Sequence, residues 1–499
     1  EPAVVLGAAL EGATVHPEPK VRIPLAMMNR HGLIAGATGT GKTKTLQLLA
    51  EQLSAAGVPV FAADVKGDLS GIAAPGTPNE KVQFRSKDIG YSWQPRSVPT
   101  EFVSLSGKLG VQLRATVSSF GPLLLAKVLS LNETQAGVLA MVFRYADDKG
   151  LLLLDFEDLR AVLQFLSSDD GKAEVKAYGG MSGATVGVLL RKMIELEEQG
   201  AGRFFGEPEF NVHDFLQVTS DGRGVVTCLE LSDVQDKPRL WSTFMMWLLA
   251  ELYQQLPEAG DLPKPKLVFF FDEAHLLFDD APEAFMEQIE RVVRLIRSKG
   301  VGVFFVTQTP KDVPESVLAQ LGNRVQHALR AHTPNDEAAL RATVRTFPKT
   351  PFYDLEETLT SLGIGEAVIT GLDARGVPTP VMAARLIPPA SRMGPLAPDE
   401  LAADIRESPL QEEYGTPVDR ESAREMLAKR VEQAGTGSTP EPGRRAESST
   451  GANVAKAAGA AIVGALTTKI GRSVGRELVR GIFGLLGAKA PGTRRRSRW

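Results

Sequence analysis

The sequence predicts an α/β fold with a mostly parallel sheet, an inserted helical subdomain and a helical C-terminal tail. The first observation behind this prediction is the alternation of helical patterns with short apolar runs, which are typical of buried strands. These runs are "VPVFAAD", "GVVTCLEL", "KLVFFFDEAH" and "VGVFFVTQTP". The second observation is a glycine-rich loop, "GATGTGKT", between a strand-like run and the helical pattern "TLQLLAEQL". Strands and helices that alternate in this way favour parallel strands covered on both faces.

The order of the patterns divides the chain into six segments. Residues 1–80 hold the first part of the core, with a short N-terminal β element from "AVVLGAAL" and "KVRIPL" that could cover one side of it. Residues 81–222 show helical periods, so we expect an inserted, mainly helical subdomain there. Residues 223–388 complete the core, and residues 389–433 predict a charged helical extension. Residues 434–452 are typical of a flexible linker, and residues 453–499 form a basic Gly- and Ala-rich segment.

Composition narrows the class of protein. The chain has 499 residues, of which 43% are hydrophobic and 23% charged, and a formal net charge of -4. These values are ordinary for a globular protein and predict no strong overall attraction to nucleic acid. The single cysteine, Cys228, lies in an apolar run, which indicates a buried strand position and a reducing compartment. We find no secretory signal and no run of roughly 18 apolar residues that could cross a membrane, so we expect a cytoplasmic protein.

The glycine-rich loop matches the pattern GxxxxGKT through Gly36, Gly41, Lys42 and Thr43. A strand before the loop and a helix after it are the context that this motif needs. Small residues let backbone N–H groups surround phosphates, while Lys42 reaches the β and γ phosphates and the Thr43 hydroxyl holds magnesium. A plain strand-to-helix turn would not require Lys and Thr at these positions. We therefore predict a site for ATP and Mg²⁺ formed by Gly36, Ala37, Thr38, Gly39, Thr40, Gly41, Lys42, Thr43 and Lys44.

An acidic pair follows the apolar run "LVFFF" and predicts the second half of the same site. Asp272 can hold the magnesium shell, and Glu273 can position and polarise the attacking water. A helix-capping pair at a strand end is the alternative for these two residues. The phosphate loop in the same chain favours the catalytic interpretation.

Two further strand ends carry polar residues. Asp64, Lys66 and Asp68 follow the run that begins at Val58, and we expect them near the site because ligands bind at the carboxyl ends of such strands. Gln308 follows the run "VGVFFVT", and we predict that it senses the γ-phosphate. A loop amide that bonds to nearby backbone groups is the alternative for Gln308.

At this point the sequence resembles a known family. The segments "GATGTGKT", "FFFDEAH" and "VTQTPKDVPESVLAQLGNRVQHALR" resemble the HerA-like branch of the FtsK and HerA superfamily of ring-forming P-loop ATPases, and "ADVKGDLSG" resembles its second-strand signature. The resemblance extends from Asn29 to Arg385. It implies a RecA-like P-loop NTPase core with an additional strand and a catalytic glutamate. It also implies a hexamer with ATP between subunits that moves a polymer, usually duplex DNA, through its pore.

The resemblance also implies roles for two arginines of this sequence. Arg297, in "RLIRSKGVG", matches the position from which family members reach the neighbour's γ-phosphate, and Arg30 matches a second arginine near the active site. An exposed helix face with salt bridges is the alternative for Arg297, and Arg330 is a third, weaker candidate. The sequence lacks the long β-barrel domain that precedes the phosphate loop in HerA proper, which leaves a partner nuclease open.

These observations predict a magnesium-dependent ATPase of the helicase or translocase type that forms a homo-hexamer and acts on DNA. Two alternatives stay open: a ring ATPase that moves protein cargo, and a nucleotide-dependent scaffold that hydrolyses ATP slowly. Glu273 disfavours the scaffold, while the near-neutral net charge keeps protein cargo possible.

The C-terminal segment departs from the average charge of the chain. From Lys469 onward it has nine basic residues and one acidic residue, Glu477. Such a segment can pack as a helix through its small residues, contact nucleic-acid phosphates through its arginines, or lie on an anionic membrane surface. We favour helix packing together with phosphate contact, because glycines interrupt the apolar face.

Overall fold

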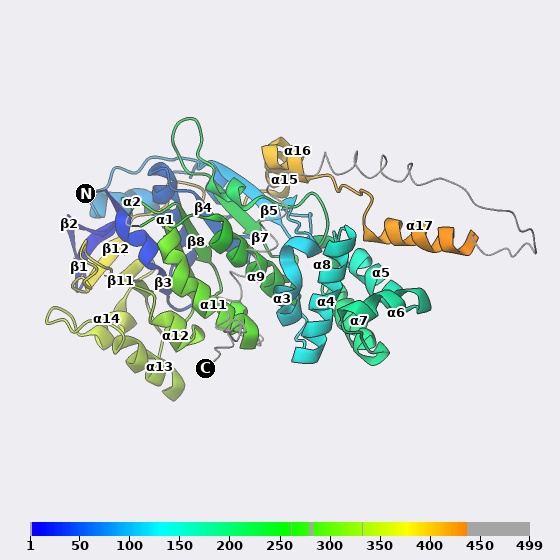
Figure 1. Ribbon diagram of the computed structural model, residues 1–499. Coiled ribbons are helices and arrows are strands. Elements are labelled where there is room, and N and C mark those ends of the chain that lie inside the picture. Colours follow the sequence, from blue (N-terminus) through cyan, green and yellow to red (C-terminus); the bar gives the residue numbers. More distant parts are fainter. Residues whose placement is uncertain (1, 261, 279–282, 332, 437–499) are drawn as a thin grey trace, which may run out of the picture. The chain divides into compact units, whose positions relative to one another are not determined.

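A twelve-stranded sheet forms the centre of this computed structural model, which describes residues 2–260, 262–278, 283–331 and 333–436 (Figure 1). The strand order in the sheet is β2-β1-β12-β11-β10-β3-β9-β8-β4-β7-β5-β6. In chain order the strands are β1 (Ala3–Glu11), β2 (Thr14–Pro24), β3 (Gly32–Ala35), β4 (Val60–Asp64), β5 (Thr100–Ser104), β6 (Val111–Gln112), β7 (Val226–Glu230), β8 (Leu267–Phe271), β9 (Val301–Thr307), β10 (Asn323–His327), β11 (Glu366–Thr370) and β12 (Met382–Leu386).

The strands from β10 to β6 in this order are all parallel to one another. The central strands β4, β7, β8 and β9 are buried along their whole length, as their apolar runs predict. Cys228 lies fully buried in β7. The mostly parallel sheet of the predicted α/β fold is therefore confirmed. Strand β9 lies between β3 and β8, which is the additional strand that the resemblance implies.

The N-terminal residues form a β element that belongs to the main sheet. Strand β1 pairs with β12 and β2 pairs with β1, both antiparallel, so this element extends one edge of the sheet. A close backbone approach makes the pairing possible, since a Cβ on Gly7 would lie 2.1 Å from the carbonyl oxygen of Arg385. The partner strand follows more than 350 residues later in the chain, and no local pattern identifies it.

Helices accompany the sheet along the chain. They are α1 (Lys42–Ala55), α2 (Glu80–Asp88), α3 (Val117–Val128), α4 (Glu133–Lys149), α5 (Phe156–Ser167), α6 (Asp169–Val175), α7 (Gly183–Glu198), α8 (Ala201–Phe204), α9 (Pro238–Gln255), α10 (His275–Phe278), α11 (Glu283–Ile296), α12 (Glu315–Leu318), α13 (Pro334–Val344), α14 (Leu355–Ser361), α15 (Pro398–Glu407), α16 (Pro409–Tyr414) and α17 (Ala423–Thr436). Leu46, Leu49 and Leu53 of α1 belong to one apolar core with Ile34 of β3 and Val306 of β9. This packing fixes the start of α1 against the end of β3.

The segment expected as a helical insertion contains part of the sheet. Residues 81–222 begin with α2, and β5 and β6 then pair with β7 and with each other in the main sheet. Strand β5 begins with the polar residues Thr100 and Glu101, and β6 has only two residues, so neither forms a long apolar run in the sequence. The helices α3 to α8 follow and gather as one group (Figure 1). Where the borders of this subdomain fall stays a prediction.

The chain divides into a unit of residues 1–424 and a C-terminal unit of residues 425–499. Helices α15 and α16 lie in the segment predicted to be a charged helical extension, and α17 spans the border between the two units. The basic segment 453–499, and the linker 434–452 except its first three residues, lie outside the described residues. Within the described part of the chain, no helix combines the length and the apolar character that crossing a membrane needs.

Candidate functional site

Six neighbouring parallel strands bring polar residues to the edge of the sheet where their carboxyl ends lie. The residues that end or directly follow these strands are Gly36 after β3, Asp64 in β4, Glu230 in β7, Asp272 after β8, Gln308 after β9 and His327 in β10. They come from positions far apart in the sequence and meet because the strands run the same way. This is the edge at which the sequence predicts the ligand.

The glycine-rich loop turns at this edge and leads directly into α1. Gly39 and Gly41 have φ angles of 76° and 113°, a region that L-residues with a side chain rarely adopt. Gly36 must also lack a side chain, since a Cβ there would lie 2.4 Å from the Cβ of His327. Because α1 begins at Lys42, its first backbone N–H groups have no partner within the helix and point toward the loop. The loop therefore has the geometry of an anion cradle.

The side chain of Lys42, the first residue of α1, reaches back into this loop. Its Nζ donates to the carbonyl oxygen of Gly36 at 2.8 Å and to that of Ala37 at 3.2 Å. Burial lowers the pKa of Lys42, and the carboxylates of Glu273 and Asp272 oppose that shift. The ammonium group is thus close to the acidic pair, as expected for two halves of one site.

Backbone hydrogen bonds fasten the loop to three neighbouring segments. The N–H of Gly36 donates to the carbonyl oxygens of Thr307 at 3.3 Å and Gln308 at 3.2 Å. The N–H of Ala37 donates to Ala328 at 2.9 Å, and the carbonyl oxygen of Thr40 accepts from the N–H of Gly365 at 2.9 Å. A movement of the loop therefore affects the ends of β9 and β10 and the start of β11.

His327 contacts the first turn of α1, next to the loop, and the sequence analysis did not identify it. Its ring is buried, and its Nε2 lies 2.8 Å from the hydroxyl oxygen of Thr45 in the first turn of α1. Burial, helped by the positive charge of Lys42, lowers the pKa of His327 to about 4, so the ring is neutral at physiological pH. A histidine in the segment "RVQHALR" gives no sign of this contact, because His327 and Thr45 are 282 positions apart.

The acidic pair lies at the end of β8 and is buried. One oxygen of Asp272 accepts from the N–H of Glu273 at 2.9 Å, while its Oδ2 has no hydrogen-bond partner in the structure. Burial, reinforced by the negative charges of Glu273, Asp64 and Asp68, raises the pKa of Asp272 to about 7. Such an unpaired buried oxygen is costly unless a cation or a proton satisfies it.

Glu273 has a different environment from Asp272. Its φ angle of 47° is unusual for a residue with a side chain, and such strain is often found at functional sites. Lys66 contacts its Oε1, and the ring Nδ1 of His275 lies 3.3 Å from its Oε2. Oε2 makes no hydrogen bond to the protein, so this oxygen can accept one from another molecule.

Three carboxylates form a group that can hold a metal ion. One oxygen each from Asp64, Asp68 and Asp272 lie within 4.8 Å of one another. Asp64 is fixed by the N–H groups of Gly67 and Leu69, both at 2.8 Å, while Oδ1 of Asp68 and Oδ2 of Asp272 have no partner. Carboxylate oxygens are the ligands that Mg²⁺ prefers, so the donor set fits this ion.

Glu230 is a second residue that the sequence analysis did not single out. It is opposite Asp64 in the register of β7 and β4, it is 2% exposed, and its Oε1 has no partner. Burial and the negative charges of Asp64, Asp233 and Asp68 raise the pKa of Glu230 to about 9. A glutamate at the end of a strand adjacent to β4 was the signal that could have found it.

The remaining predicted residues fall into two groups. Thr43 is the second residue of α1, and Gln308 is exposed next to the loop, to which its carbonyl oxygen is bonded. Arg297 is exposed in the 3₁₀ turn that precedes β9, and Arg30 ends the 3₁₀ turn that precedes β3. Both arginines therefore lie at the amino-end edge, opposite the phosphate loop of the same chain. Arg330, after β10, donates to the carbonyl oxygen of Thr360 at 3.1 Å.

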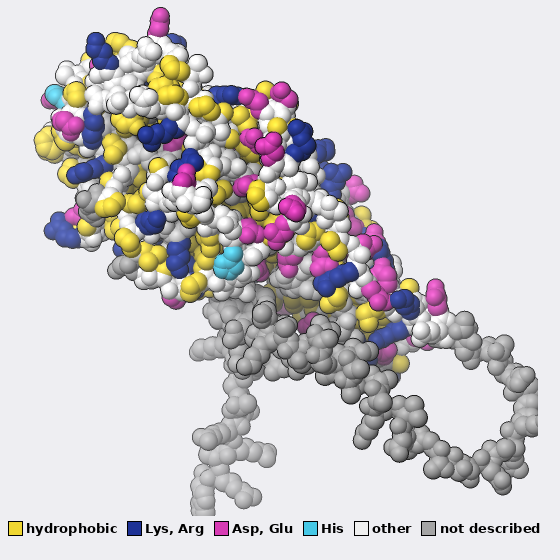
Figure 2. Space-filling view, turned by 90° about the horizontal axis from the view of Figure 1, so that it is seen from above, with side chains coloured by type: hydrophobic (Ala, Val, Ile, Leu, Met, Phe, Trp, Pro, Cys, Tyr) yellow, Lys and Arg dark blue, Asp and Glu magenta, His cyan; other side chains and the backbone are white. Residues whose placement is uncertain are grey.

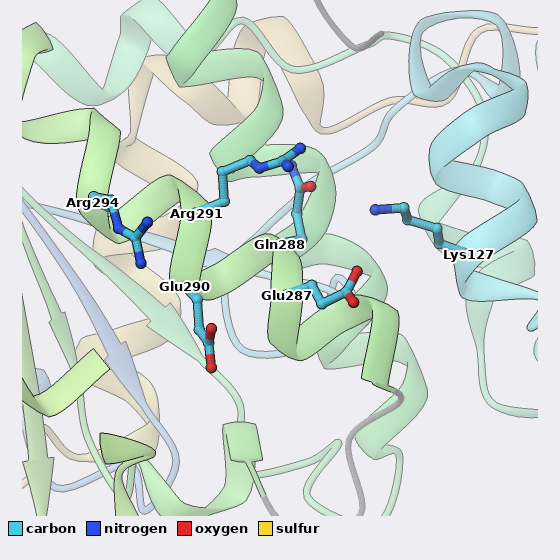
Figure 3. Close-up of a pocket in the computed structure, with 6 residues that line it drawn as sticks. All are labelled: Lys127, Glu287, Gln288, Glu290, Arg291 and Arg294. Atoms are coloured by element: carbon cyan, nitrogen blue, oxygen red, sulfur yellow. The ribbon is translucent and has the colours of Figure 1, made fainter. Parts of the chain in front are cut away.

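A separate cavity of about 230 Å³ lies between α3 and α11 (Figure 3). Its labelled side chains carry charges of both signs, with Lys127 on α3 facing Glu287 and Gln288 on α11. Burial lowers the pKa of Lys127. None of its lining residues belongs to the loop or the acidic group, so it is not part of the site described above.

Comparisons with known proteins identify similar chains. The model of the helicase HerA-like C-terminal family matches residues 11–491. The DNA double-strand break repair helicase HerA of Sulfurisphaera tokodaii is 24% identical over 363 residues, which cover 72% of this chain and 66% of the relative. The protein of the same name from Sulfolobus acidocaldarius is 22% identical over 353 residues, covering 70% of this chain and 64% of the relative. The chain thus spans slightly less than two thirds of the length of these relatives.

The fold is also similar to that of solved structures. The plasmid coupling protein TrwB, in complex with a non-hydrolysable GTP analogue, aligns with a TM-score of 0.50 and 13% identity over 79% of this chain and 98% of TrwB. A TrwB complex with a non-hydrolysable ATP analogue gives a TM-score of 0.50 and 13% identity, over 77% of this chain and 94% of TrwB. At this identity the likeness concerns the fold alone, and it confirms the RecA-like P-loop fold.

Proposed function

The chain belongs to the helicase HerA-like C-terminal family, and on that basis we propose that it is a ring-forming, magnesium-dependent ATPase that couples ATP hydrolysis to movement along DNA. One observation carries the proposal most directly. The phosphate loop with Lys42 and the buried pair Asp272 and Glu273 meet at one edge of the sheet, and both acidic residues have an oxygen without a hydrogen-bond partner. A site built only for stability would not leave such oxygens unpaired.

Binding of ATP would use the loop and its lysine. The backbone N–H groups at the start of α1 would hold phosphate oxygens, and Lys42 would exchange the carbonyl oxygens of Gly36 and Ala37 for the phosphates. Mg²⁺ would be held by the Thr43 hydroxyl and Asp272, with Asp64 and Asp68 close enough to join its shell directly or through water. When bound, the ion neutralises the charge that develops on the phosphates.

Glu273 would act on the attacking water. Lys66 holds one of its oxygens and leaves Oε2 to accept the proton of water. Lys66 contacts Oε1 and the ring Nδ1 of His275 lies 3.3 Å from Oε2, so both side chains would help to orient the carboxylate. Gln308, joined through its backbone to Gly36, would report whether the γ-phosphate is present.

The position of the arginines supports a site shared between copies of the chain. Arg297 is exposed at the edge of the sheet away from its own phosphate loop. We propose that it completes the site of a neighbouring copy in a homo-hexamer, with Arg30 as a second contribution from the same edge. A ring of identical copies joined head to tail would place one copy's amino-end edge against the next copy's carboxyl-end edge.

DNA is the proposed polymer because the curated relatives are named DNA repair helicases. Basic and acidic side chains are interspersed on the face in Figure 2, so DNA contact would be local and not spread over that face. Protein cargo and a slowly hydrolysing scaffold are the alternatives. We place the protein in the cytoplasm, which suits a single cysteine buried in β7.

The test is the rate of ATP hydrolysis in the presence of Mg²⁺, measured with duplex DNA, with single-stranded DNA and with no polymer. We expect the full chain to hydrolyse ATP, and we expect duplex DNA to raise the rate of hydrolysis. The variant Lys42→Ala should hydrolyse ATP neither with DNA nor without it. Hydrolysis that no DNA stimulates would favour protein cargo. Tight ATP binding without measurable turnover would favour the scaffold.

A further inference from the structure

A buried histidine at the amino-end edge of the sheet has no part in the phosphate loop or the acidic group. His31 follows Arg30 directly, precedes β3 and is 2% exposed. Its φ angle is 58°, in a region that residues with a side chain seldom adopt. Strained backbone of this kind persists only where the surrounding structure holds it in place. The segments around His31 therefore determine its position closely.

Strand β10 holds the backbone of this residue. The carbonyl oxygen of His31 accepts from the N–H of Asn323 at 3.1 Å and from the side-chain Nδ2 of Asn323 at 3.0 Å. The carbonyl oxygen of Arg30 accepts from the N–H of Gly322 at 3.0 Å. Arg30 and His31 are thus fixed to the start of β10 by three hydrogen bonds.

The ring of His31 contacts β9 and lies near α11. Its Nδ1 accepts from the N–H of Val303 at 3.0 Å, so a neutral ring carries its proton on Nε2. Burial lowers the pKa of His31 to about 4, the nearby carbonyl group of Val293 opposes this shift, and the positive charge of Arg30 adds to it. Nε2 is buried and lacks the geometry of a hydrogen bond to any partner. The ring is therefore neutral at physiological pH and close to both elements.

Val293 and Val303 lie on the two sides of the turn that carries Arg297. Val293 belongs to α11 and comes one helical turn before Arg297, whereas Val303 belongs to β9 and comes six residues after it. The His31 ring thus lies at the corner between α11 and β9, and the turn with Arg297 closes this corner.

The corner leaves little room for displacement. A Cβ on Gly302, the second residue of β9, would lie 2.3 Å from the carbonyl oxygen of Met28 in the turn that ends at Arg30. The segment with Arg30 and the start of β9 therefore pack backbone against backbone. A change in the His31 ring would move the two segments relative to each other, because close-packed interiors transmit such changes.

We propose that His31 is a positioning residue that sets Arg30 and Arg297 at a fixed spacing for the nucleotide of a neighbouring copy. The inference rests on the proposed function, in which both arginines complete a neighbour's site. His31 acts through its chain neighbour Arg30 on one side and through the corner of α11 and β9 on the other. A neutral ring joins the two segments without a further positive charge beside the arginines, which would repel them.

The first measurement separates turnover from ATP binding. His31→Leu removes both polar atoms of the ring, and we expect kcat to fall by about 10²-fold, as for other small displacements remote from the reacting atoms. The KM for ATP should stay unchanged, because the phosphate loop of the same chain lies at the opposite edge. His31→Asn retains an acceptor near Nδ1 and tolerates a positive φ, so it should keep more of the rate than the leucine variant.

His327→Leu is the matched control. His327 is also a buried histidine, at 0% exposure, but it contacts Thr45 at the start of α1 and belongs to the carboxyl-end edge. Its loss should raise the KM for ATP. A merely structural role of both histidines would give the same kinetic change in the two variants.

The second measurement mixes variants and follows ATP hydrolysis by assemblies that contain both. His31→Leu keeps an intact carboxyl-end edge, so mixing it with Glu273→Gln should restore part of the activity, whereas mixing it with Arg297→Ala should restore none. His327→Leu should show the reverse pattern. If His31→Leu does not fold, His31→Asn takes its place in both mixtures.

The outcomes distinguish this inference from the proposed function. If the parent did not hydrolyse ATP, or if Arg297→Ala kept the parental rate, the proposed function would fail and the inference with it. If Glu273→Gln and Arg297→Ala restored each other but His31→Leu kept the parental kcat, only the inference would be wrong. Recovery of His31→Leu with Arg297→Ala, or with neither partner, would likewise contradict a role of His31 in positioning the arginines.

Discussion

The two edges of the parallel sheet differ in what they carry, although the same strands end at both. At the carboxyl-end edge, Asp64, Asp68 and Asp272 share a small space, and oxygens of the last two lack a partner. At the amino-end edge, polar side chains bond to the backbone: Asn323 donates to the carbonyl oxygens of Met27 at 2.9 Å and His31 at 3.0 Å. The carboxyl-end edge thus holds buried carboxylate oxygens without a hydrogen-bond partner, while the amino-end edge joins chain segments and exposes Arg297. Under the proposed function, a complete site combines both edges, from two copies of the chain.

The strongest test of this comparison removes the exposed arginine. We expect Arg297→Ala to bind ATP and form rings but to lose turnover by on the order of a thousandfold, as for other arginines that act on a neighbour's phosphate. The measurement is the steady-state ATPase rate together with the assembly state. Arg294→Ala, an exposed arginine one turn earlier on α11, serves as the control and should keep its rate. Full activity of Arg297→Ala would mean that the amino-end edge has no catalytic part.

The next largest effect should come from the opposite edge. Glu273→Gln keeps the shape of the side chain but cannot accept the proton of water, so turnover should fall by about 10²–10⁴-fold with ATP binding retained. Mixing this variant with Arg297→Ala tests the shared site directly, because some interfaces then pair an intact glutamate with an intact arginine. Mixed rings should regain part of the activity. Mixed rings without any recovery would contradict a site formed by two copies.

A smaller effect should follow from loss of the contact between His327 and Thr45, at the start of α1. His327→Leu leaves the Thr45 hydroxyl without its buried partner, which we expect to destabilise the fold by about 1–3 kcal/mol and to weaken ATP binding. Thermal unfolding and ATP titration measure the two effects. His327→Gln can still bond to Thr45 and should restore part of both. If the leucine variant bound ATP like the parent, the contact would stabilise the fold without positioning the loop.

The last effect concerns stability alone, namely its dependence on pH at the carboxyl-end edge. The pKa of Glu230 is raised to about 9 in the folded chain. The unfolded chain releases this proton once the pH exceeds the ordinary pKa of glutamate, whereas the folded chain keeps it until the pH approaches 9. The contribution of Glu230 to stability is therefore full at low pH and is lost as the pH rises toward 9. Relative to Glu230→Gln, the free energy of unfolding of the parent should therefore fall by at most about 1.4 kcal/mol per pH unit between pH 5 and 9.

Chemical denaturation of both proteins at pH 5.5 and pH 8, with a chelator present, measures this difference. Glu356→Gln, on an exposed position of α14, should follow the parent at both pH values. A constant difference between Glu230→Gln and the parent would mean that the buried carboxyl group ionises normally.

Local patterns explain why part of the site could be predicted from sequence. The loop from Gly36 to Thr43 and the pair Asp272 and Glu273 are continuous segments next to apolar strands, and the strands themselves are recognisable by their burial pattern. The contacts between segments could not be predicted in the same way. Lys66 reaches Glu273 across 207 positions, because β4 and β8 are neighbours in the sheet. The order of the strands determines such contacts, and periodicity does not reveal it.

The same reason explains what could not be predicted about the fold. The edge position of β1 depends on its pairing with β12. Strand β5 begins with two polar residues and β6 has only two residues, so neither stands out as an apolar run. His327 and Glu230 each look like an ordinary polar residue at the end of a strand. His327 matters because it contacts Thr45, and Glu230 because it lies opposite Asp64. Both partners come from distant segments of the chain.

The sheet's two outermost strands bear on how copies of this chain can associate. Strand β2, with the sequence TVHPEPKVRIP, interrupts its free row of backbone donors with Pro17 and Pro19 and carries mostly exposed side chains, while β6 at the other end has only two residues. Prolines, charges and short strands at an edge discourage another chain from adding itself by β-pairing. The sheets of separate copies therefore resist fusing into a continuous aggregate, even where copies meet at high concentration.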